Sequence, residues 1–225
     1  MRINQFIAGS TDLSRRAADA AIAAGRVQVN GQTATLGHLV DARDTVTLDE
    51  RPLNLRQTHT YVVLHKPAGY VSSRAQQSTD PTAYDLLPDK FKTLRIAGRL
   101  DRDSSGLLVL SDDGDFIQAL THPSAEKSKH YEITLESPIS KADLVRLETG
   151  VTLTDGPSLV KIIEADGKHL TVALSEGRNR QLRRTFGALG YTVVRLHRLS
   201  MGRFSLGDLA SGAWRETDEQ GRLKP

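Results

Sequence analysis

Charged side chains gather just before an apolar run in the segment AGRLDRDSSGLLVL, residues 97–110. Asp101 lies between Arg99 and Asp103 in an expected loop, and the run Leu107–Leu110 that follows is typical of a buried strand. A carboxylate at the mouth of a buried strand is costly unless a cation or a hydrogen-bond donor pairs with it. Asp101 therefore needs a cationic or hydrogen-bonding partner, which the fold must supply.

Arginines that could be this partner follow in EGRNRQLRRTFGALG, residues 176–190. A Gly-Arg turn opens an expected helix, Asn179–Leu189, on which arginines share one face. A charged helix face is usually only solvated, but acids are scarce around this one. Between residues 176 and 203, Glu176 alone opposes Arg178, Arg180, Arg183, Arg184, Arg195, Arg198 and Arg203. Such a field suits phosphate, so contact with nucleic acid is the favoured interpretation.

Two other polar segments have simpler interpretations. In HKPAGYVSS, residues 65–73, Pro67 and Gly69 end a strand and leave Lys66 at a position where side chains often meet ligands. Taken alone, this pattern is more often an ordinary strand exit. The aspartates around Gly114 lack the twelve-residue ligand pattern of a calcium loop and its terminal glutamate, so we interpret them as turn and helix-cap residues.

The first fifty residues form a unit of their own, with two helices on a small sheet. The expected elements are a helix over Arg2–Ala8, a helix from the N-cap Ser14 through Ala24, a strand at Val27–Val29, a hairpin turn at Asn30-Gly31 and a strand at Thr45–Leu48. Arg15 and Arg16 begin the second helix, where they oppose the helix dipole. An anionic partner would relieve that opposition, and a solvated helix face explains it equally well.

The polar stretch Glu50–Thr58 contains Pro52 and has no clear period, which makes it the candidate linker. We therefore expect two domains, residues 1–57 and 58–225. The expected elements of the second are strands Tyr61–Leu64, Leu107–Leu110, Tyr131–Leu135 and Leu170–Leu174, and helices Asp115–Leu120, Lys141–Thr149 and Asn179–Leu189. This mixture predicts an α+β fold. The polar tail after Trp214 is expected to fray.

The composition excludes several classes of protein. The 225 residues contain no cysteine, so disulfides, thiolate metal sites and a cysteine nucleophile are excluded. No apolar signal core and no long apolar span is present, so we expect a cytoplasmic protein without membrane association. The net charge of +3 is too small to identify a partner by itself.

The segment SRRAADAAIAAGRVQVNG, residues 14–31, resembles the S4 RNA-binding module, and the likeness extends over residues 1–50. Modules of this family contact RNA phosphates through basic residues of the helix pair. The resemblance implies that Arg2, Arg15, Arg16 and Arg26 are RNA-binding residues.

Four segments in this order, SRRAADAAIAAGRVQVNG, HKPAGYVSS, AGRLDRDSSGLLVLSDDGDF and EGRNRQLRRTFGALGYTVVRLHR, resemble the pseudouridine synthases of the RsuA type. Within this likeness, GRLDRDSSGLL, KHYEI at 129–133 and EGRNRQLRR are similar to motifs of the family. The likeness covers nearly the whole chain. It implies an S4-like helix-plus-sheet module followed by a larger, mixed, mainly antiparallel sheet with flanking helices. It also implies an isomerase that converts a specific uridine of ribosomal RNA to pseudouridine, with no metal and no organic cofactor.

The resemblance also implies roles for single residues. In this family an aspartate detaches uracil from its ribose, the base rotates, and its C5 rejoins the same sugar carbon. Asp101 matches that aspartate, acting as nucleophile or as base. Arg183 matches an arginine that pairs with the aspartate and keeps it ionised. Tyr131 matches a tyrosine that stacks on the target base and assists proton removal at C5.

Reaching a base inside folded RNA requires extruding it, which favours unpaired sites. We expect Arg99, beside Asp101, to hold the displaced nucleotide. Lys66, Arg178 and Arg180 are expected to contact RNA as well.

Other functions are weaker fits to the residues. A noncatalytic RNA-binding protein for ribosome assembly or RNA chaperoning would use the same basic segments, but here Asp101, Tyr131 and Arg183 are all present. A phosphate-directed hydrolase lacks its Gly-rich loop with the required lysine and lacks a metal-ligand cluster.

The identity of the RNA stays open between two sets of motifs. The S4-like module and LESPIS, residues 135–140, are similar to the RsuA branch itself, whereas LTDGP at 153–157 and MGRFSLGDLASGAWRE at 201–216 are similar to the RluE branch, which acts on large-subunit RNA. The expected partner is ribosomal RNA or a ribosomal assembly intermediate, and the expected oligomeric state is a monomer.

Overall fold

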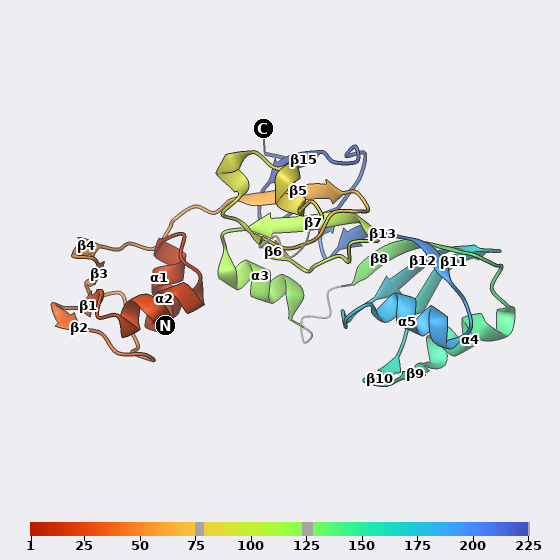
Figure 1. Ribbon diagram of the computed structural model, residues 1–225, viewed down its shortest axis with the longest axis horizontal. Coiled ribbons are helices and arrows are strands. Elements are labelled where there is room, and N and C mark those ends of the chain that lie inside the picture. The colour runs from red at the N-terminus through yellow and green to blue at the C-terminus, as the bar shows by residue number, and fades with distance from the viewer. Residues whose placement is uncertain (75–78, 123–127, 225) are drawn as a thin grey trace. The chain divides into compact units, whose positions relative to one another are not determined.

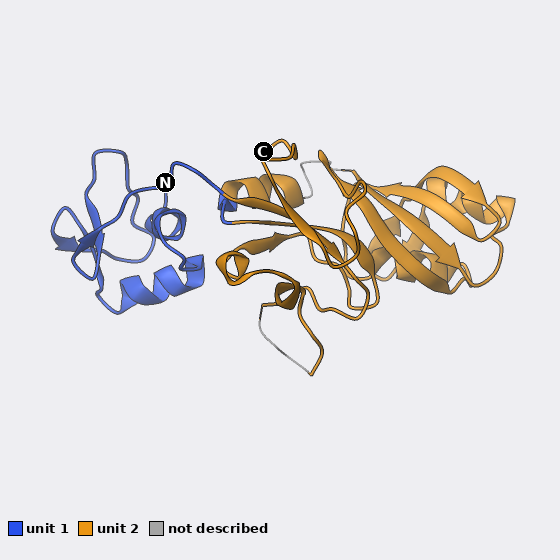
Figure 2. Cartoon of the chain, turned by 90° about the horizontal axis from the view of Figure 1, so that it is seen from above, with its two compact units in different colours: residues 1–59, 112–114 blue, residues 60–111, 115–225 orange. Residues whose placement is uncertain are grey.

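A computed structural model describes residues 1–74, 79–122 and 128–224 of the chain. They divide into two compact units (Figure 2). Unit 1 is residues 1–59 with residues 112–114, and unit 2 is the remainder. The expected domain boundary between residues 57 and 58 stays a prediction, although the change of unit at residues 59 and 60 lies close to it.

Unit 1 contains two helices and a small antiparallel sheet with the strand order β2-β1-β3-β4. Its elements are α1 (Ile3–Ser10), α2 (Arg15–Ala23), β1 (Val27–Val29), β2 (Gln32–Thr33), β3 (Val46–Leu48) and β4 (Arg51–Pro52). Ser14 Oγ accepts a hydrogen bond from the Ala17 backbone N–H at 3.1 Å, which makes it the expected N-cap of α2. Asn30 and Gly31 have φ values of 52° and 81°, as a two-residue hairpin turn requires. The expectation that Arg51–Pro52 belongs to a linker is wrong, because these residues pair with β3 at the edge of the sheet, where a proline is tolerated.

Unit 2 is built on a nine-stranded sheet. Its strands are β5 (Tyr61–Lys66), β6 (Arg95–Ala97), β7 (Ser105–Ser111), β8 (Lys129–Leu135), β11 (Lys161–Asp166), β12 (His169–Leu174), β13 (Val193–Met201), β14 (Phe204–Ser205) and β15 (Trp214–Thr217). Outside the sheet lie the 3₁₀ turns η1 (Ala83–Leu86) and η2 (Asp89–Phe91), the helices α3 (Gly114–Thr121), α4 (Lys141–Thr149) and α5 (Gln181–Ala188), and the hairpin β9 (Val151–Leu153) and β10 (Gly156–Ser158).

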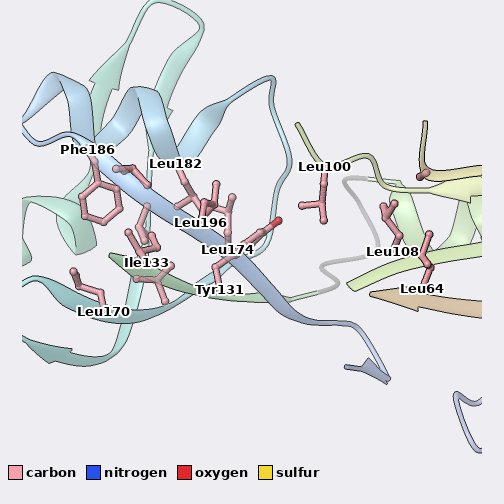
Figure 3. Packing of buried hydrophobic residues seen from close by; sticks show 14 of the residues in the cluster. Leu64, Leu100, Leu108, Tyr131, Ile133, Leu170, Leu174, Leu182, Phe186 and Leu196 are labelled. Atoms are coloured by element: carbon pink, nitrogen blue, oxygen red, sulfur yellow. The ribbon is translucent and has the colours of Figure 1, made fainter. Parts of the chain in front are cut away.

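The strands follow the order β11-β12-β8-β13-β7-β5-β15, with β14 on β13 and β6 on β7 (Figure 1). The β13–β7 pair is parallel and the other pairs are antiparallel, so the expected mixed, mainly antiparallel sheet is confirmed. Residues of β7 alternate between two cores: Leu108 and Leu110 belong to the larger core, and Leu107 and Val109 to the smaller. α5 adds Phe186 to the larger core (Figure 3).

Seven strands of unit 2 have no counterpart among the expected strands, namely β6, β9, β10, β11, β13, β14 and β15, and β13 and β15 show why. β13, which lies between β8 and β7, has no counterpart among the expected strands, because its arginines and histidine hide the apolar period. The tail after Trp214 does not begin to fray there, because Trp214–Thr217 form β15 and pair with β5 at the sheet edge. Both strands are defined by partners far away in the sequence. In the part of the chain that the structure describes, no helix is long and apolar enough to cross a membrane.

Candidate active site

The loop that carries Asp101 connects β6 to β7 and is held by the segment that follows β5. Ser72 Oγ donates to the Leu100 carbonyl at 2.7 Å and accepts from the Leu100 N–H at 3.1 Å. The Gly69 N–H donates to the Arg102 carbonyl at 2.7 Å. The HKPAGYVSS segment therefore positions the backbone on both sides of Asp101.

Lys66 supports the same loop from inside the molecule. It has no exposed surface, and its ammonium group donates to the carbonyls of Pro67 at 2.8 Å and of Ser104 at 2.6 Å. Burial lowers the pKa of Lys66 to about 8, although the charges of Asp103 and Asp101 oppose that shift. The expectation that Lys66 binds RNA stays a prediction, and in this structure its charged group is directed into the protein and donates to backbone carbonyls.

Gly106, where the loop enters β7, permits an unusually close approach of two strands. It pairs with Arg198 of β13, and a Cβ atom at Gly106 would lie 2.2 Å from the Arg198 carbonyl oxygen. The buried Arg198 side chain in turn donates to the carbonyls of Leu107 at 2.9 Å and Gly98 at 2.7 Å. Arg198 thus fastens both ends of the Asp101 loop to β13. The sequence did not indicate this structural role, because Arg198 lies among the arginines that suggest contact with phosphate.

The carboxylate of Asp101 is partly exposed, with 29% of its side chain accessible. Its nearest cation is Arg180, whose Nη1 lies 3.7 Å from Oδ2. Among the residues that the structure describes, no group donates a hydrogen bond to this carboxylate. Asp101 therefore has a cationic neighbour, as its position requires, and retains free acceptor positions.

The expected ion pair between Arg183 and Asp101 is not formed. Arg183 Nε lies 3.2 Å from Asp103 Oδ2, and its other nitrogens donate to the carbonyls of Val193 at 2.7 Å and Asp103 at 3.0 Å. Burial lowers the pKa of Arg183, and the charge of Asp103 opposes this. The carbonyls of Asp103 in the loop and of Val193 in β13 hold the Arg183 guanidinium beside Asp103. The cation nearest to Asp101 is therefore Arg180.

Asp103, which was not among the expected site residues, forms ion pairs with both arginines and accepts side-chain hydrogen bonds from Arg180. Arg180 donates to its two carboxylate oxygens at 3.1 Å each, and Arg183 forms the ion pair described above. Burial opposes ionisation of Asp103, but the hydrogen bonds from Arg180 and the two cationic charges outweigh it and hold the pKa of Asp103 below its ordinary value. The only sequence signal for Asp103 is its place two residues after Asp101.

Tyr131 of β8 lies in the same part of the sheet. It stands opposite Arg198 of β13, which pairs with Gly106 of β7, so its backbone is about 10 Å from the end of the loop at ordinary strand spacing. The ring is buried in the larger core together with Leu100, and Figure 3 shows its hydroxyl end directed toward Leu100. The sheet thus places Tyr131 beside the loop residue that precedes Asp101.

Arg178 differs from its expected role. Its side chain donates to Asp155 Oδ1 at 2.9 Å and to the carbonyls of Asp155 and Gly156 at 3.0 Å and Pro157 at 2.7 Å. Arg184 donates to both oxygens of the same carboxylate, at 2.9 and 2.7 Å. Arg178 therefore locks the β9–β10 turn, and an RNA phosphate would have to displace these bonds to reach it.

The remaining expected RNA contacts lie on exposed or partly exposed surface. Arg99 is exposed and makes no hydrogen bond or ion pair with the described residues. In unit 1, Arg2 and Arg16 are exposed and Arg15 is half-buried at the start of α2. Arg26 is paired with a carboxylate, that of Asp49. Arg2, Arg16 and Arg99 are exposed enough to meet a phosphate backbone, whereas Arg26 would have to leave or share Asp49.

No metal centre accompanies these groups in the described ranges. No set of three or more histidine, aspartate and glutamate side chains there is arranged to hold a metal ion. The site groups are the carboxylates of Asp101 and Asp103, the guanidinium groups of Arg180 and Arg183 and the phenol of Tyr131, which can serve acid–base, nucleophilic and electrostatic chemistry.

Comparison with known proteins is consistent across the chain. A family model described as RNA pseudouridylate synthase matches residues 60–188, and one for the S4 domain matches residues 1–46. The chain is 37% identical to ribosomal small subunit pseudouridine synthase A of Pseudomonas aeruginosa, covering 96% of each chain. It is 34% identical to ribosomal large subunit pseudouridine synthase B of Bacillus subtilis, covering 96% of this chain and 91% of that one. A crystal structure of a pseudouridylate synthase superposes with a TM-score of 0.71 and 31% identity, covering 97% of this chain and 96% of that one.

Proposed function

The chain belongs to the RNA pseudouridylate synthase family and isomerises uridine to pseudouridine in RNA, and we propose that its substrate is ribosomal RNA and that Asp101 is its catalytic carboxylate. The observation that carries the role of Asp101 is the state of its carboxylate. It is partly exposed, it lies on a loop fastened from three sides, and it accepts no hydrogen bond from the described residues although a guanidinium lies 3.7 Å away. A carboxylate held in place but left uncommitted is what an incoming ribose requires.

The reaction conserves every atom of the nucleotide. The bond between uracil N1 and the ribose C1′ breaks, the base turns, a bond forms between C5 and C1′, and the C5 proton is lost while N1 gains one. Asp101 acts at the sugar, either by attacking C1′ or by removing a sugar proton. Both routes need the ionised carboxylate, and the Arg180 guanidinium lies 3.7 Å from it.

Tyr131 is proposed to contact the extruded base. Its register beside Arg198 and its hydroxyl direction place a phenol near the Asp101 loop, where it can assist removal of the C5 proton. Tyr131→Phe keeps the buried ring, so we expect a folded protein in which pseudouridine formation is slower by about 100-fold. A variant as active as the wild type would exclude the hydroxyl from the reaction.

The proposal of ribosomal RNA rests on the relatives and on unit 1. The similar proteins from Pseudomonas aeruginosa and Bacillus subtilis are named as small-subunit and large-subunit ribosomal enzymes respectively. The S4 domain supplies Arg2, Arg15, Arg16 and Arg26 as proposed phosphate contacts. Pseudouridine maps of both ribosomal RNAs, from cells with and without this gene, would identify the uridine.

The test of Asp101 compares Asp101→Asn with Asp155→Asn, a carboxylate that also binds α5 arginines but belongs to the β9–β10 turn. Each protein is incubated with unmodified ribosomal RNA, and pseudouridine is mapped by chemical probing. We expect no detectable product with Asp101→Asn and wild-type yield with Asp155→Asn. Full activity of Asp101→Asn would refute the role of Asp101. Tight RNA binding without product from any variant or the wild type would instead favour a noncatalytic RNA-binding protein.

A further inference from the structure

Asp103 holds the two arginines that stand closest to the reacting carboxylate. Arg180 is bound at two points, with 3.1 Å from each Nη atom to an oxygen of Asp103, while its Nη1 is 3.7 Å from Asp101 Oδ2. The guanidinium therefore lies between two carboxylates and is committed to the one that does no chemistry. A shift of less than 1 Å would bring it into hydrogen-bond range of Asp101.

The backbone of Arg180 indicates that this placement is imposed by its surroundings. The residue caps α5 with φ 45° and ψ 32°, a left-handed conformation that costs a non-glycine residue free energy. Such strain persists where contacts over-determine a position, and the two-point bond to Asp103 is the strongest side-chain contact that Arg180 makes.

A direct ion pair between Arg180 and Asp101 would occupy the carboxylate oxygens and reduce their basicity and nucleophilicity. We propose that Asp103 is a positioning residue, which holds the Arg180 guanidinium in a two-point pair and so prevents it from closing on Asp101. This inference rests on the proposed function of Asp101. The motif then contains two carboxylates with different roles: Asp101 reacts, and Asp103 binds the nearest cation, Arg180.

The charged groups around Asp101 come from its own loop, the α5 segment and β5, and they are Asp103, Arg180, Arg183 and Lys66. Tyr131 of β8 and Arg198 of β13 lie opposite one another in the neighbouring part of the sheet, and the charge of Arg198 acts on Lys66. Lys66 and Arg183 are tied to backbone carbonyls. Arg180, with 45% of its side chain exposed, is the cation among them with room to move.

The experiment measures pseudouridine formation against pH for the wild type, Asp103→Asn, Arg180→Gln and the double variant, using the ribosomal RNA that the wild type modifies. In Asp103→Asn, we expect kcat on the pH plateau to fall by about tenfold, because Arg180 closes on Asp101. KM should not rise, because the variant has one negative charge fewer to repel RNA. The acid limb should move to lower pH, since an anion near Asp101 is lost and a cation approaches it.

The double variant gives the sharpest result. Removing Arg180 from the Asp103→Asn protein should raise the plateau kcat again, whereas removing it from the wild type should not. Arg180→Gln alone should move the acid limb to higher pH, the opposite of Asp103→Asn, because Asp101 loses a cation. This single variant also keeps the proposal testable if Asp103→Asn does not fold.

Asp155→Asn is the matched control, because it breaks ion pairs to two α5-segment arginines without approaching Asp101. It should leave both plateau and acid limb unchanged. The proposal would be overturned if the plateau kcat of Asp103→Asn equalled that of the wild type, or if adding Arg180→Gln did not restore the lost kcat. Neither outcome would change the role proposed for Asp101. An inactive wild type would instead refute the proposed function.

Discussion

Asp103 and Asp155 perform the same pairing at two places along one helix. Each carboxylate binds two arginines of the segment 178–184, and the two are similarly exposed, at 47% and 42% of the side chain. By composition and contact type the two clusters are alike. They differ in the third group within reach of the arginines.

At Asp155, the third group is the backbone of a turn. Arg178 donates to the carbonyls of Asp155, Gly156 and Pro157, so the cluster closes on itself and fixes the β9–β10 hairpin against α5. At Asp103, the third group is the uncommitted carboxylate of Asp101. An arginine–carboxylate pair is thus structural where its arginine also binds backbone carbonyls, and it can serve a reaction where an unpaired carboxylate lies beside it.

The largest contrast is expected between the adjacent residues Arg183 and Arg184. Arg183→Gln removes a cation beside the Asp101 loop and leaves the carbonyls of Val193 and Asp103 without their donor, so pseudouridine formation should fall by about 100-fold. Arg184→Gln loses an exposed pair with Asp155 and should stay within about twofold of the wild type. Single-turnover rates on the same RNA decide the matter, and equal effects would show that the two clusters are not different.

A smaller effect is expected at Lys66, the buried cation that supports the Asp103 loop and has no equivalent at the Asp155 turn. Lys66→Met leaves the carbonyls of Pro67 and Ser104 without a donor and should lower the free energy of unfolding by about 2 kcal/mol at pH 7.

The pH dependence of this difference has a definite sign. The folded pKa of Lys66 is about 8, against 10.5 for the free side chain, so between these values the unfolded chain binds more protons. The wild type therefore gains stability relative to Lys66→Met as pH rises from 8 to 10.5. Denaturant melts at several pH values measure the difference in free energy of unfolding between the wild type and Lys66→Met, with a variant of the exposed Lys168 as control. A stability difference that does not widen over this range would show that Lys66 stays charged.

The smallest effect is expected at Asp155. Its pairs with Arg178 and Arg184 are partly exposed, so Asp155→Asn should lower Tm slightly at low salt and leave it unchanged at high salt, where such pairs are screened. Thermal melts at two salt concentrations, with Asp103→Asn beside it, provide the measurement. Loss of activity in Asp155→Asn would remove the contrast between the two carboxylates.

Local signals in the sequence predict much of the secondary structure of unit 1, and they predict which segments of unit 2 are apolar and which are charged. Ser14 caps α2 because its own hydroxyl reaches a backbone N–H three residues on, and Asn30-Gly31 turns the chain because these residues tolerate positive φ. Both facts depend on residues adjacent in the chain. β13 and β15 were missed because a strand of mixed polarity is specified by its distant partners.

The sequence by itself determined the class of chemistry, because a carboxylate motif, a tyrosine motif and an arginine helix in one order are chemical identities that do not depend on coordinates. Only the tertiary structure decided which groups meet. In the folded protein the Lys66 side chain points into the interior, and Arg183 binds Asp103 and backbone carbonyls. Arg180 is the cation that lies beside Asp101. The physical reason is that a long cationic side chain binds whichever acceptor packing brings within about 3 Å, and residues separated by eighty positions are brought there by the sheet.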